Sequence, residues 1–234
     1  MIIKKYELTD ETIIVDGRIL HRIKALDNFG DVRKGELGGF IEKEKNLSKG
    51  GNCWVYNNAK VYDNAEVTGH AKILDEAVVC RNAKVFSTAR IHDNAKVFGT
   101  ARIYNNAEVF MNADVYDNAA VHGNAKVYDN AQISGNTIIS GDVKVFGDVM
   151  IKINSIIFGN AEIKNINDFI EFKNWWSSGR HFIWTRSNNM WCVGCFYGTG
   201  KELIEKAYKD SDISGREYER VVKYVEEIIH NNCK

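Results

Sequence analysis

An aliphatic residue returns at every sixth position from Val55 to Ile163 without interruption. Alanine stands two places before most of these residues, from Ala59 to Ala131 and again at Ala161. Side chains at alternate positions of an extended strand share one face, so each alanine and the aliphatic residue after it point inward. Each six-residue unit is therefore predicted to form one short strand.

The positions between these strands hold mostly Gly, Asp and Asn, which tolerate positive φ at a corner. A fixed alternation of strand and corner predicts a solenoid. Its coils stack at roughly 4.8 Å, so equivalent side chains form ladders along the axis. Lys49–Asn52 adds two residues to the pattern and is predicted to be the single irregular corner.

This repeat resembles the hexapeptide-repeat proteins, which fold as a left-handed parallel β-helix with three units in each eighteen-residue turn. Residues within 35–56 and Val193–Thr199 add a narrower likeness to hexapeptide-repeat proteins of phage and prophage genomes, often labelled polymer-forming cytoskeletal. The resemblance implies a left-handed triangular β-helix solenoid. The flanking segments add an N-terminal β cap and a small C-terminal α+β module, so the chain is predicted to be mainly β.

Three domains are expected from the pattern: an N-terminal β cap over 1–37, the β-helix over 38–164 and the C-terminal module over 165–234. Asp16-Gly17 between two apolar runs indicates a hairpin in the cap, which would cover the open end of the solenoid. In the module, aromatic-rich segments predict three strands over 169–176, 181–185 and 190–196. Capping residues predict helices that open at Thr199 and Ser214.

Charge and cysteine content limit the functional classes. The 31 basic residues balance the 31 acidic ones, so no global field attracts nucleic acid or a membrane. No apolar run is long enough to span a bilayer, and a cytoplasmic protein of a bacterial host is expected. The five scattered cysteines favour free thiols, and Cys192 and Cys195 lack the second pair that a zinc site needs. No cofactor and no metal ion are expected.

The outward positions of one predicted face combine aromatic and basic residues in columns spaced by eighteen. This aromatic and basic column comprises Tyr56, Arg90, His92, Phe110, Lys126, Tyr128, Lys144 and Phe146. One interpretation is strand packing plus the interface of a homo-oligomer, with a trimer favoured. The other is a platform on which a small nucleotide stacks, since rings offer π faces and cations attract phosphate. Acidic corners disfavour long nucleic acid.

A second group of recognition candidates lies in the C-terminal module. It comprises Trp175, Trp176, Arg180, His181, Trp184 and Arg186. The tryptophans can form the core of the module or a recognition surface, and core packing is the default interpretation. His181 between two arginines is a candidate for an anion contact, with solvated charges as the alternative.

Many hexapeptide-repeat proteins are acyltransferases, so the resemblance also makes His70, His92 and His122 candidates for a general base. His70 replaces a corner Asn and is interpreted as a ladder substituent. The acyltransferases extrude a loop from the coil, whereas no coil from Val55 to Ile163 is interrupted here. The main prediction is therefore a non-catalytic, plausibly phage-encoded oligomer that sequesters or blocks a host-defence protein or a small nucleotide signal. The alternatives are an acyl-CoA-dependent acyltransferase and a structural virion component.

Overall fold

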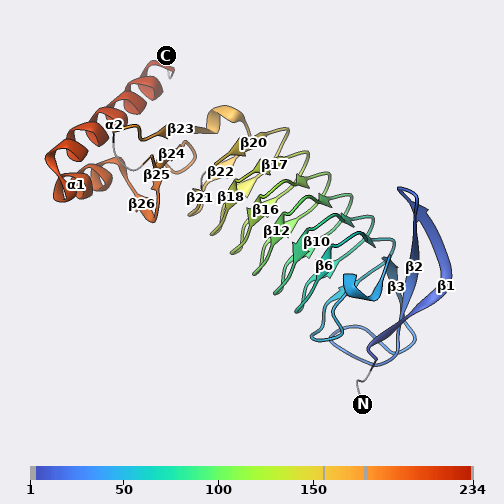
Figure 1. Ribbon diagram of the computed structural model, residues 1–234. Helices are drawn as coiled ribbons and strands as arrows, with labels where there is room; N and C mark the ends of the chain where they lie inside the picture. The colour runs from blue at the N-terminus through green and yellow to red at the C-terminus, as the bar shows by residue number, and fades with distance from the viewer. Residues whose placement is uncertain (1–3, 155, 177–178, 233–234) are drawn as a thin grey trace. The chain divides into compact units, whose positions relative to one another are not determined.

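The computed structural model describes residues 4–154, 156–176 and 179–232, and they form a mainly β chain. Its central part is a three-sided solenoid whose faces are parallel sheets (Figure 1). The first of these, the β4 face, contains β4 (Trp54–Val55), β7 (Lys72–Ile73), β10 (Arg90–Ile91), β13 (Glu108–Val109), β16 (Lys126–Val127), β19 (Lys144–Val145) and β22 (Glu162–Ile163).

Two further sheets complete the three sides. The β5 face contains β3 (Leu37–Ile41), β5 (Lys60–Val61), β8 (Val78–Val79), β11 (Lys96–Val97), β14 (Asp114–Val115), β17 (Gln132–Gly135) and β20 (Met150–Ile153). The β6 face contains β6 (Glu66–Val67), β9 (Lys84–Val85), β12 (Arg102–Ile103), β15 (Ala120–Val121), β18 (Ile138–Ile139) and β21 (Ile156–Ile157).

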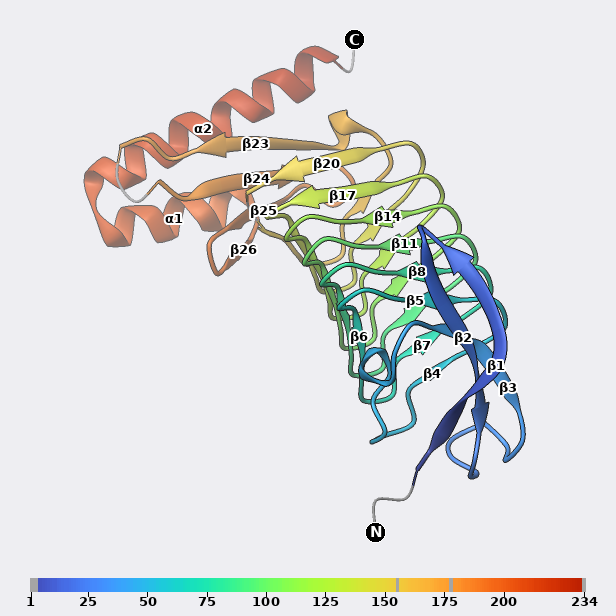
Figure 2. The ribbon, with the colours of Figure 1, turned by 45° about the vertical axis from the view of Figure 1, so that its right-hand side comes forward.

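Each strand pairs in parallel with the strand one coil before it and the strand one coil after it. Arg90 of β10 lies opposite Lys72 and opposite Glu108, at offsets of eighteen residues along the chain. Three six-residue units therefore make one turn, as the resemblance implies. Figure 2 shows β5, β8, β11, β14 and β17 as successive rungs of one face. The predicted β-helix solenoid is confirmed.

The repeated alanines and aliphatic residues fill the interior. Ala95, Val97, Ala101 and Ile103 are each 0% exposed, and the same holds for their equivalents in neighbouring coils. Small and β-branched side chains suit this interior because each coil offers only one shallow layer of space between three close backbones. The outward residues between them remain available for contacts between coils and with solvent.

The corners depart from the prediction at one place. At the expected irregular corner Gly51 has φ +70°, and a Cβ there would clash with the carbonyl oxygen of Gly69. A second irregularity was not predicted: β17 and β20 are four residues long, and Ser134 and Thr137 are buried between them. Thr137 Oγ1 donates to the Ser134 carbonyl at 2.6 Å. The prediction of a single irregular corner is wrong, because Ile153 stands one coil after Gly135 in the corner column and β20 continues through it, with the Ile153 N–H donating to Thr137 Oγ1 at 3.0 Å.

The predicted N-terminal hairpin is present. β1 (Tyr6–Val15) pairs with β2 (Arg18–Ala25), and Asp16 and Gly17 form the turn with φ 49° and 75°. β2 then pairs with β3 in antiparallel fashion, and β3 pairs in parallel with β5. The hairpin therefore extends the sheet of the β5 face. A 3-10 turn over Glu44–Asn46 follows. The indole of Trp54 is fully buried beneath this end of the solenoid.

The chain divides into two compact units, Met1–Asp168 and Phe169–Lys234, and the first ends in a 3-10 turn over Ile166–Asp168. The second unit contains an antiparallel sheet of β23 (Phe169–Lys173), β24 (His181–Thr185), β25 (Met190–Val193) and β26 (Phe196–Gly198). The prediction of three strands is wrong, because Gly194, with φ 59°, turns the chain within the third predicted strand. That strand therefore divides into β25 and β26.

Two helices follow that sheet. α1 (Gly200–Asp210) begins with the predicted capping box, in which Thr199 and Glu202 bond to each other's backbone. α2 (Asp212–Asn232) begins two residues before the predicted start, because Ser211 rather than Ser214 supplies the side-chain acceptor. Leu203 and Val222 of the helices pack on Phe182 of the sheet. No helix in the described part of the chain is long and apolar enough to cross a membrane.

Candidate functional site

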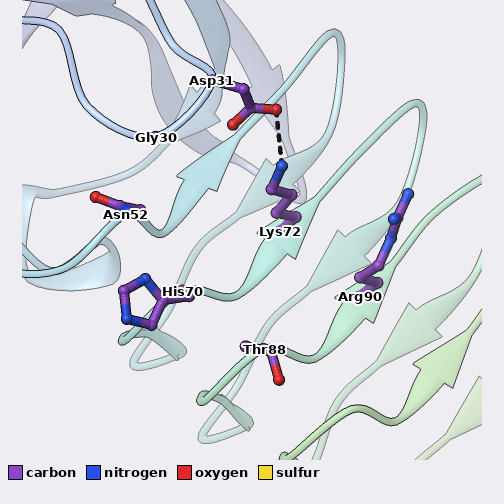
Figure 3. A pocket seen from close by; sticks show the side chains of 7 residues that line it. All are labelled: Gly30, Asp31, Asn52, His70, Lys72, Thr88 and Arg90. Atoms are coloured by element: carbon purple, nitrogen blue, oxygen red, sulfur yellow. Dashed lines mark hydrogen bonds and ion pairs between the residues drawn. The ribbon is translucent and has the colours of Figure 1, made fainter.

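A hollow of about 300 Å³ lies on the β4 face near its N-terminal end (Figure 3). Lys72 and Arg90 line it from the neighbouring strands β7 and β10. The corners before these strands contribute His70 and Thr88. The remaining lining residues are Gly30, Asp31 and Asn52. The hollow therefore combines solenoid residues with residues from the segment before the first coil.

The wall of the hollow is the loop between β2 and β3, residues 26–36. Phe29 and Val32 close a tight turn in this loop through reciprocal backbone hydrogen bonds of 3.1 and 2.9 Å. The Phe29 ring packs edge-on against Trp54 at 5.3 Å, and Val32 is fully buried. The ammonium of Lys5 lies 4.4 Å from the centre of the Phe29 ring. These contacts hold the turn, and with it Gly30 and Asp31, against the solenoid.

Asp31 ties the loop to the β4 face. Its carboxylate accepts a hydrogen bond from Lys72 Nζ at 2.7 Å and one from the Tyr56 hydroxyl at 2.8 Å. The hydrogen bond from Lys72 lowers the pKa of the Asp31 carboxyl. Burial, followed by the hydrogen bond to Asp31, raises the pKa of Tyr56. The loop is therefore fastened by a charged pair and a phenol that stays protonated at neutral pH.

The His70 imidazole has no side-chain hydrogen bond to any other described residue, although its corner column is hydrogen-bonded further along. Thr88 donates to Asn106 at 2.6 Å, Asn106 to Asn124 at 3.0 Å, and Asn124 to Asp142 at 2.9 Å. The interpretation of His70 as a ladder substituent agrees with its place in this column, but among the described residues its ring adds no side-chain hydrogen bond to the ladder, which begins one coil later at Thr88. Its ring is exposed at the rim of the hollow.

The groups in the hollow support two kinds of chemistry. Arg90 has five N–H donors, and its one described ion pair, to Glu108, is long at 4.0 Å. Lys72 has three donors, of which Asp31 occupies at least one. The two cations can therefore bind the phosphate or carboxylate of a ligand. A neutral imidazole next to them can accept a proton from a bound nucleophile.

The structure brings the aromatic residues of the predicted column together as parallel stacks. His92 lies on Phe110 at 4.9 Å, Phe110 on Tyr128 at 4.9 Å, and Tyr128 on Phe146 at 5.1 Å between ring centres. Because neighbouring rings face one another, they present mainly their edges to solvent. Such a column offers little π face on which a base could stack.

Most of the cations in the column are paired with carboxylates. Lys126 lies 2.8 Å from Glu108, and Lys144 lies 2.9 Å from Glu162. The bond to Glu162 raises the pKa of Lys144. Of the predicted column, Arg90 lines the hollow, and Tyr56 reaches the wall of the hollow through Asp31.

The other two candidate bases lie outside the hollow. His92 is on the β4 face with Nδ1 3.3 Å from Asp93. His122 follows β15 of the β6 face and stacks on Tyr104 at 4.6 Å. Burial, followed by the nearby charge of Arg102, lowers the pKa of His122. The two histidines therefore belong to different faces, as the periodicity predicts.

The C-terminal candidates do not form one surface. Trp184 is buried in the core of its unit and donates to Asn189 at 2.8 Å, and Trp176 packs against the same core. Trp175 is 83% exposed. His181 Nδ1 lies 2.6 Å from Glu171, on the neighbouring strand.

The two arginines of that group, Arg180 and Arg186, are exposed. No disulfide joins Cys53, Cys80, Cys192 and Cys195 within the described part of the chain, and Cys233 lies outside the described residues. Cys192 is buried in β25 and Cys195 is exposed after it. Sequence reasoning missed the loop over 26–36 and its Asp31; the two-residue insertion before Val55 was the only indication that this end of the solenoid differs.

Comparisons with known proteins bear on the type of chemistry. No model of a known protein family matches the chain. Among curated proteins, the chain is similar to YdcK of Escherichia coli strain K12, which is named an uncharacterized acetyltransferase. The two are 36% identical over 76 residues, which cover 29% of this chain and 23% of the relative. The match therefore spans less than a quarter of the relative's length.

This similarity overturns the prediction of a non-catalytic, phage-encoded binding protein, because the similar protein is named as an enzyme. It agrees better with the acyltransferase alternative. A β-solenoid with parallel strands and a similarity to an acetyltransferase are both typical of hexapeptide-repeat proteins. Nothing in the comparisons supports the narrower likeness to phage or cytoskeletal proteins.

Proposed function

We propose that the protein is an acyltransferase that moves an acyl group from a CoA thioester to a hydroxyl or amine acceptor, with the hollow on the β4 face as its active site. The observation that carries this proposal is the His70 imidazole, without a side-chain partner among the described residues, at the rim of a hollow lined by Lys72 and Arg90. The similarity to a protein named an acetyltransferase supports it.

The residues have distinct roles in this reaction. His70 accepts the proton of the acceptor hydroxyl or amine as that atom attacks the thioester carbonyl. The carbon–sulfur bond breaks when the tetrahedral intermediate collapses, and the thiolate of CoA leaves. Arg90 and Lys72 hold an anionic group of one substrate through charge-assisted hydrogen bonds. This fixes the reacting atoms near the imidazole, which lowers the entropic cost of reaction.

The uninterrupted coils do not oppose this proposal. In the hexapeptide-repeat acyltransferases, a loop that projects from the coil encloses the site of the acyl donor. Here the loop over 26–36 walls the donor site instead, because Asp31 forms hydrogen bonds with Lys72 and Tyr56 on the β4 face. A wall that precedes the first coil leaves the six-residue period intact.

We also propose that the protein works as a homotrimer in the bacterial cytoplasm. The half-buried aromatic edges on each solenoid face and the exposed hairpin pair Ile14 and Ile19, 77% and 57% exposed, supply apolar surface for contacts between copies. Light scattering checks the subunit number, and a monomer or an open-ended filament contradicts a closed trimer.

The enzymatic proposal is tested by incubating the protein with acetyl-CoA and a panel of amino and hydroxyl acceptors, and by measuring free CoA and acetylated product by mass spectrometry. Replacing His70 with Ala is expected to lower kcat/KM by about 10²–10⁴-fold, the usual contribution of a general base. Arg90→Ala is expected to act mainly through KM, because the guanidinium binds and does not transfer protons.

A matched control is His122→Ala, which removes a histidine from a different face. It is expected to retain the activity of the unaltered protein. Equal losses in the two histidine variants, or activity that survives His70→Ala, would show that the hollow is not the active site. Absence of acyl transfer to every acceptor together with no binding of acetyl-CoA in calorimetry would reject the function itself.

A further inference from the structure

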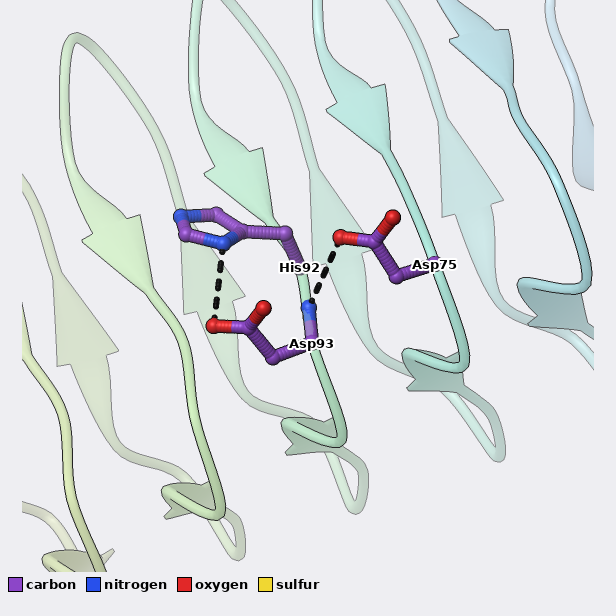
Figure 4. Close-up of side chains that lie close together, drawn as sticks. All are labelled: Asp75, His92 and Asp93. Carbon is purple, nitrogen blue, oxygen red and sulfur yellow. Dashed lines mark hydrogen bonds and ion pairs between the residues drawn. The ribbon is translucent and has the colours of Figure 1, made fainter.

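Three side chains of types that can bind metal ions lie close together at a corner of the solenoid beyond the hollow (Figure 4). They are Asp75, His92 and Asp93, and one ligand atom from each lies within 4.8 Å of the others. Nδ1 of His92 is 3.3 Å from Asp93 Oδ2. All three residues are partly buried. The acyl-transfer chemistry proposed above uses none of them.

The side chains are held in place by the coil itself. Asp75 and Asp93 occupy equivalent left-handed corner positions of successive coils, with φ 59° and 56°. Asp75 Oδ2 accepts the backbone N–H of Asp93 at 3.2 Å, and Asp93 Oδ2 accepts that of Met111 at 3.0 Å. The His92 ring is fixed by its parallel stack on Phe110. A carboxylate has about four lone-pair sites, so each can still coordinate an ion.

The electrostatics of this corner are unusual within the repeat. Two carboxylates one coil apart repel each other, and no Lys or Arg forms an ion pair with either in the described structure. For the other aspartates at left-handed corner positions, the equivalent residue in the next coil is basic or neutral. The pairs are Asp63 with Arg81, Asp117 with Gly135 and Asp129 with Gly147. Among the described corner columns, Asp75 and Asp93 are the only acidic residues at equivalent positions of successive coils.

We propose that Asp75, His92 and Asp93 bind one divalent transition-metal ion, through two carboxylate oxygens and the imidazole Nδ1. A mixed set of imidazole and carboxylate ligands suits Zn²⁺, with water in the remaining position. The ion offsets the repulsion between the two carboxylates. It also joins the coil that carries β7 to the coil that carries β10, so it stabilises the folded state by mass action.

The site is tested with metal alone, on protein whose accessible thiols have been alkylated so that cysteine does not compete. Titration with Zn²⁺ in a calorimeter is expected to show one site, and Asp75→Asn and His92→Ala are each expected to weaken it by at least about tenfold. With Cu²⁺ as a paramagnetic probe, electron paramagnetic resonance is expected to show coupling to a single imidazole nitrogen, and His92→Ala is expected to remove that coupling.

His122→Ala is the matched control, because Gly123 follows His122 where Asp93 follows His92. It is expected to leave both the affinity and the spectrum unchanged. Thermal unfolding without metal verifies that each variant is folded. Binding that Asp75→Asn and His92→Ala leave unchanged, or that His122→Ala weakens equally, overturns the proposal. Loss of acyl transfer in a variant that still binds metal bears on the proposed active site in the hollow and does not contradict the metal site.

Discussion

The first coils and the middle coils of the solenoid are built from the same six-residue unit but use it differently. In the middle coils, from β11 to β16, equivalent corner residues are joined by side-chain hydrogen bonds from coil to coil. In the first coils Asn58 still bonds to Glu76 and Asn64 to Asn82, but in the described structure the column of His70 has no such bond before Thr88, and a loop from outside the repeat covers one face. The repeat supplies a rigid support in both regions. The proposed catalytic residue, His70, lies where the column of side-chain hydrogen bonds is interrupted.

The difference extends to what fills the interior. The middle coils bury only alanine, valine and isoleucine. The first coil buries the indole of Trp54, against which Tyr6 and Phe29 pack edge-on at 6.1 and 5.3 Å. Tyr6 also donates to the Leu47 carbonyl at 2.8 Å. One large side chain therefore connects the hairpin, the loop over 26–36 and the solenoid, so the hollow depends on it.

The largest expected effect comes from removing that connection. Trp54→Ala is expected to destabilise the protein by about 3–5 kcal/mol, since it deletes a fully buried aromatic side chain. The comparison in the middle coils is Ile103→Val, for which about 0.5–1.5 kcal/mol is expected. Urea unfolding of both variants, followed by circular dichroism, measures the difference.

Trp54→Phe separates two contributions at this site. The indole Nε1 of Trp54 is buried without a hydrogen-bond partner among the described residues, which itself costs free energy. Phenylalanine keeps most of the apolar contact and removes that group, so a much smaller loss than for Trp54→Ala is expected. If Trp54→Ala costs no more than Ile103→Val, the first coil is not held by this residue.

A smaller effect of opposite sign is expected at the broken ladder. His70→Asn places an amide one coil before Thr88, where it can extend the hydrogen-bonded column. Stability is expected to increase by about 0.5 kcal/mol, the low end for a hydrogen bond because the position is exposed. Acyl transfer is expected to fall to the level of His70→Ala, since an amide cannot accept the proton.

The matched change in the middle coils is Asn106→Ala, which removes two rungs of the same column. It is expected to lower the urea midpoint slightly and to leave acyl transfer unchanged. Together the two variants show whether stability and activity conflict at this corner. An increase in activity in His70→Asn would contradict the role of the imidazole.

The regular part of the fold could be predicted because its information is local and repeated. A valine or isoleucine at every sixth position admits few structures, and the aromatic stack from His92 to Phe146 follows from the offset of eighteen. The hollow could not be predicted in this way. Asp31 lies 41 positions from Lys72, and no period connects them. The packing of Phe29 on Trp54 and the hydrogen bonds of Asp31 to Lys72 and Tyr56 hold the loop on the β4 face.

The smallest expected effect concerns the pH dependence of that loop. The hydrogen bond from Lys72 lowers the pKa of Asp31, so the carboxylate's contribution is complete above its ordinary pKa of about 3.9 and is lost as the pH falls through the lowered value. Asp31 is 56% exposed, so global stability changes little. Amide hydrogen exchange at Phe29 and Val32, whose N–H groups donate to each other's carbonyl oxygens, is expected to accelerate relative to β11 only in strong acid. Asp31→Asn is expected to show fast exchange at every pH. Equal pH profiles for the two proteins would mean that the contacts of Phe29 hold the wall of the hollow without the charged pair.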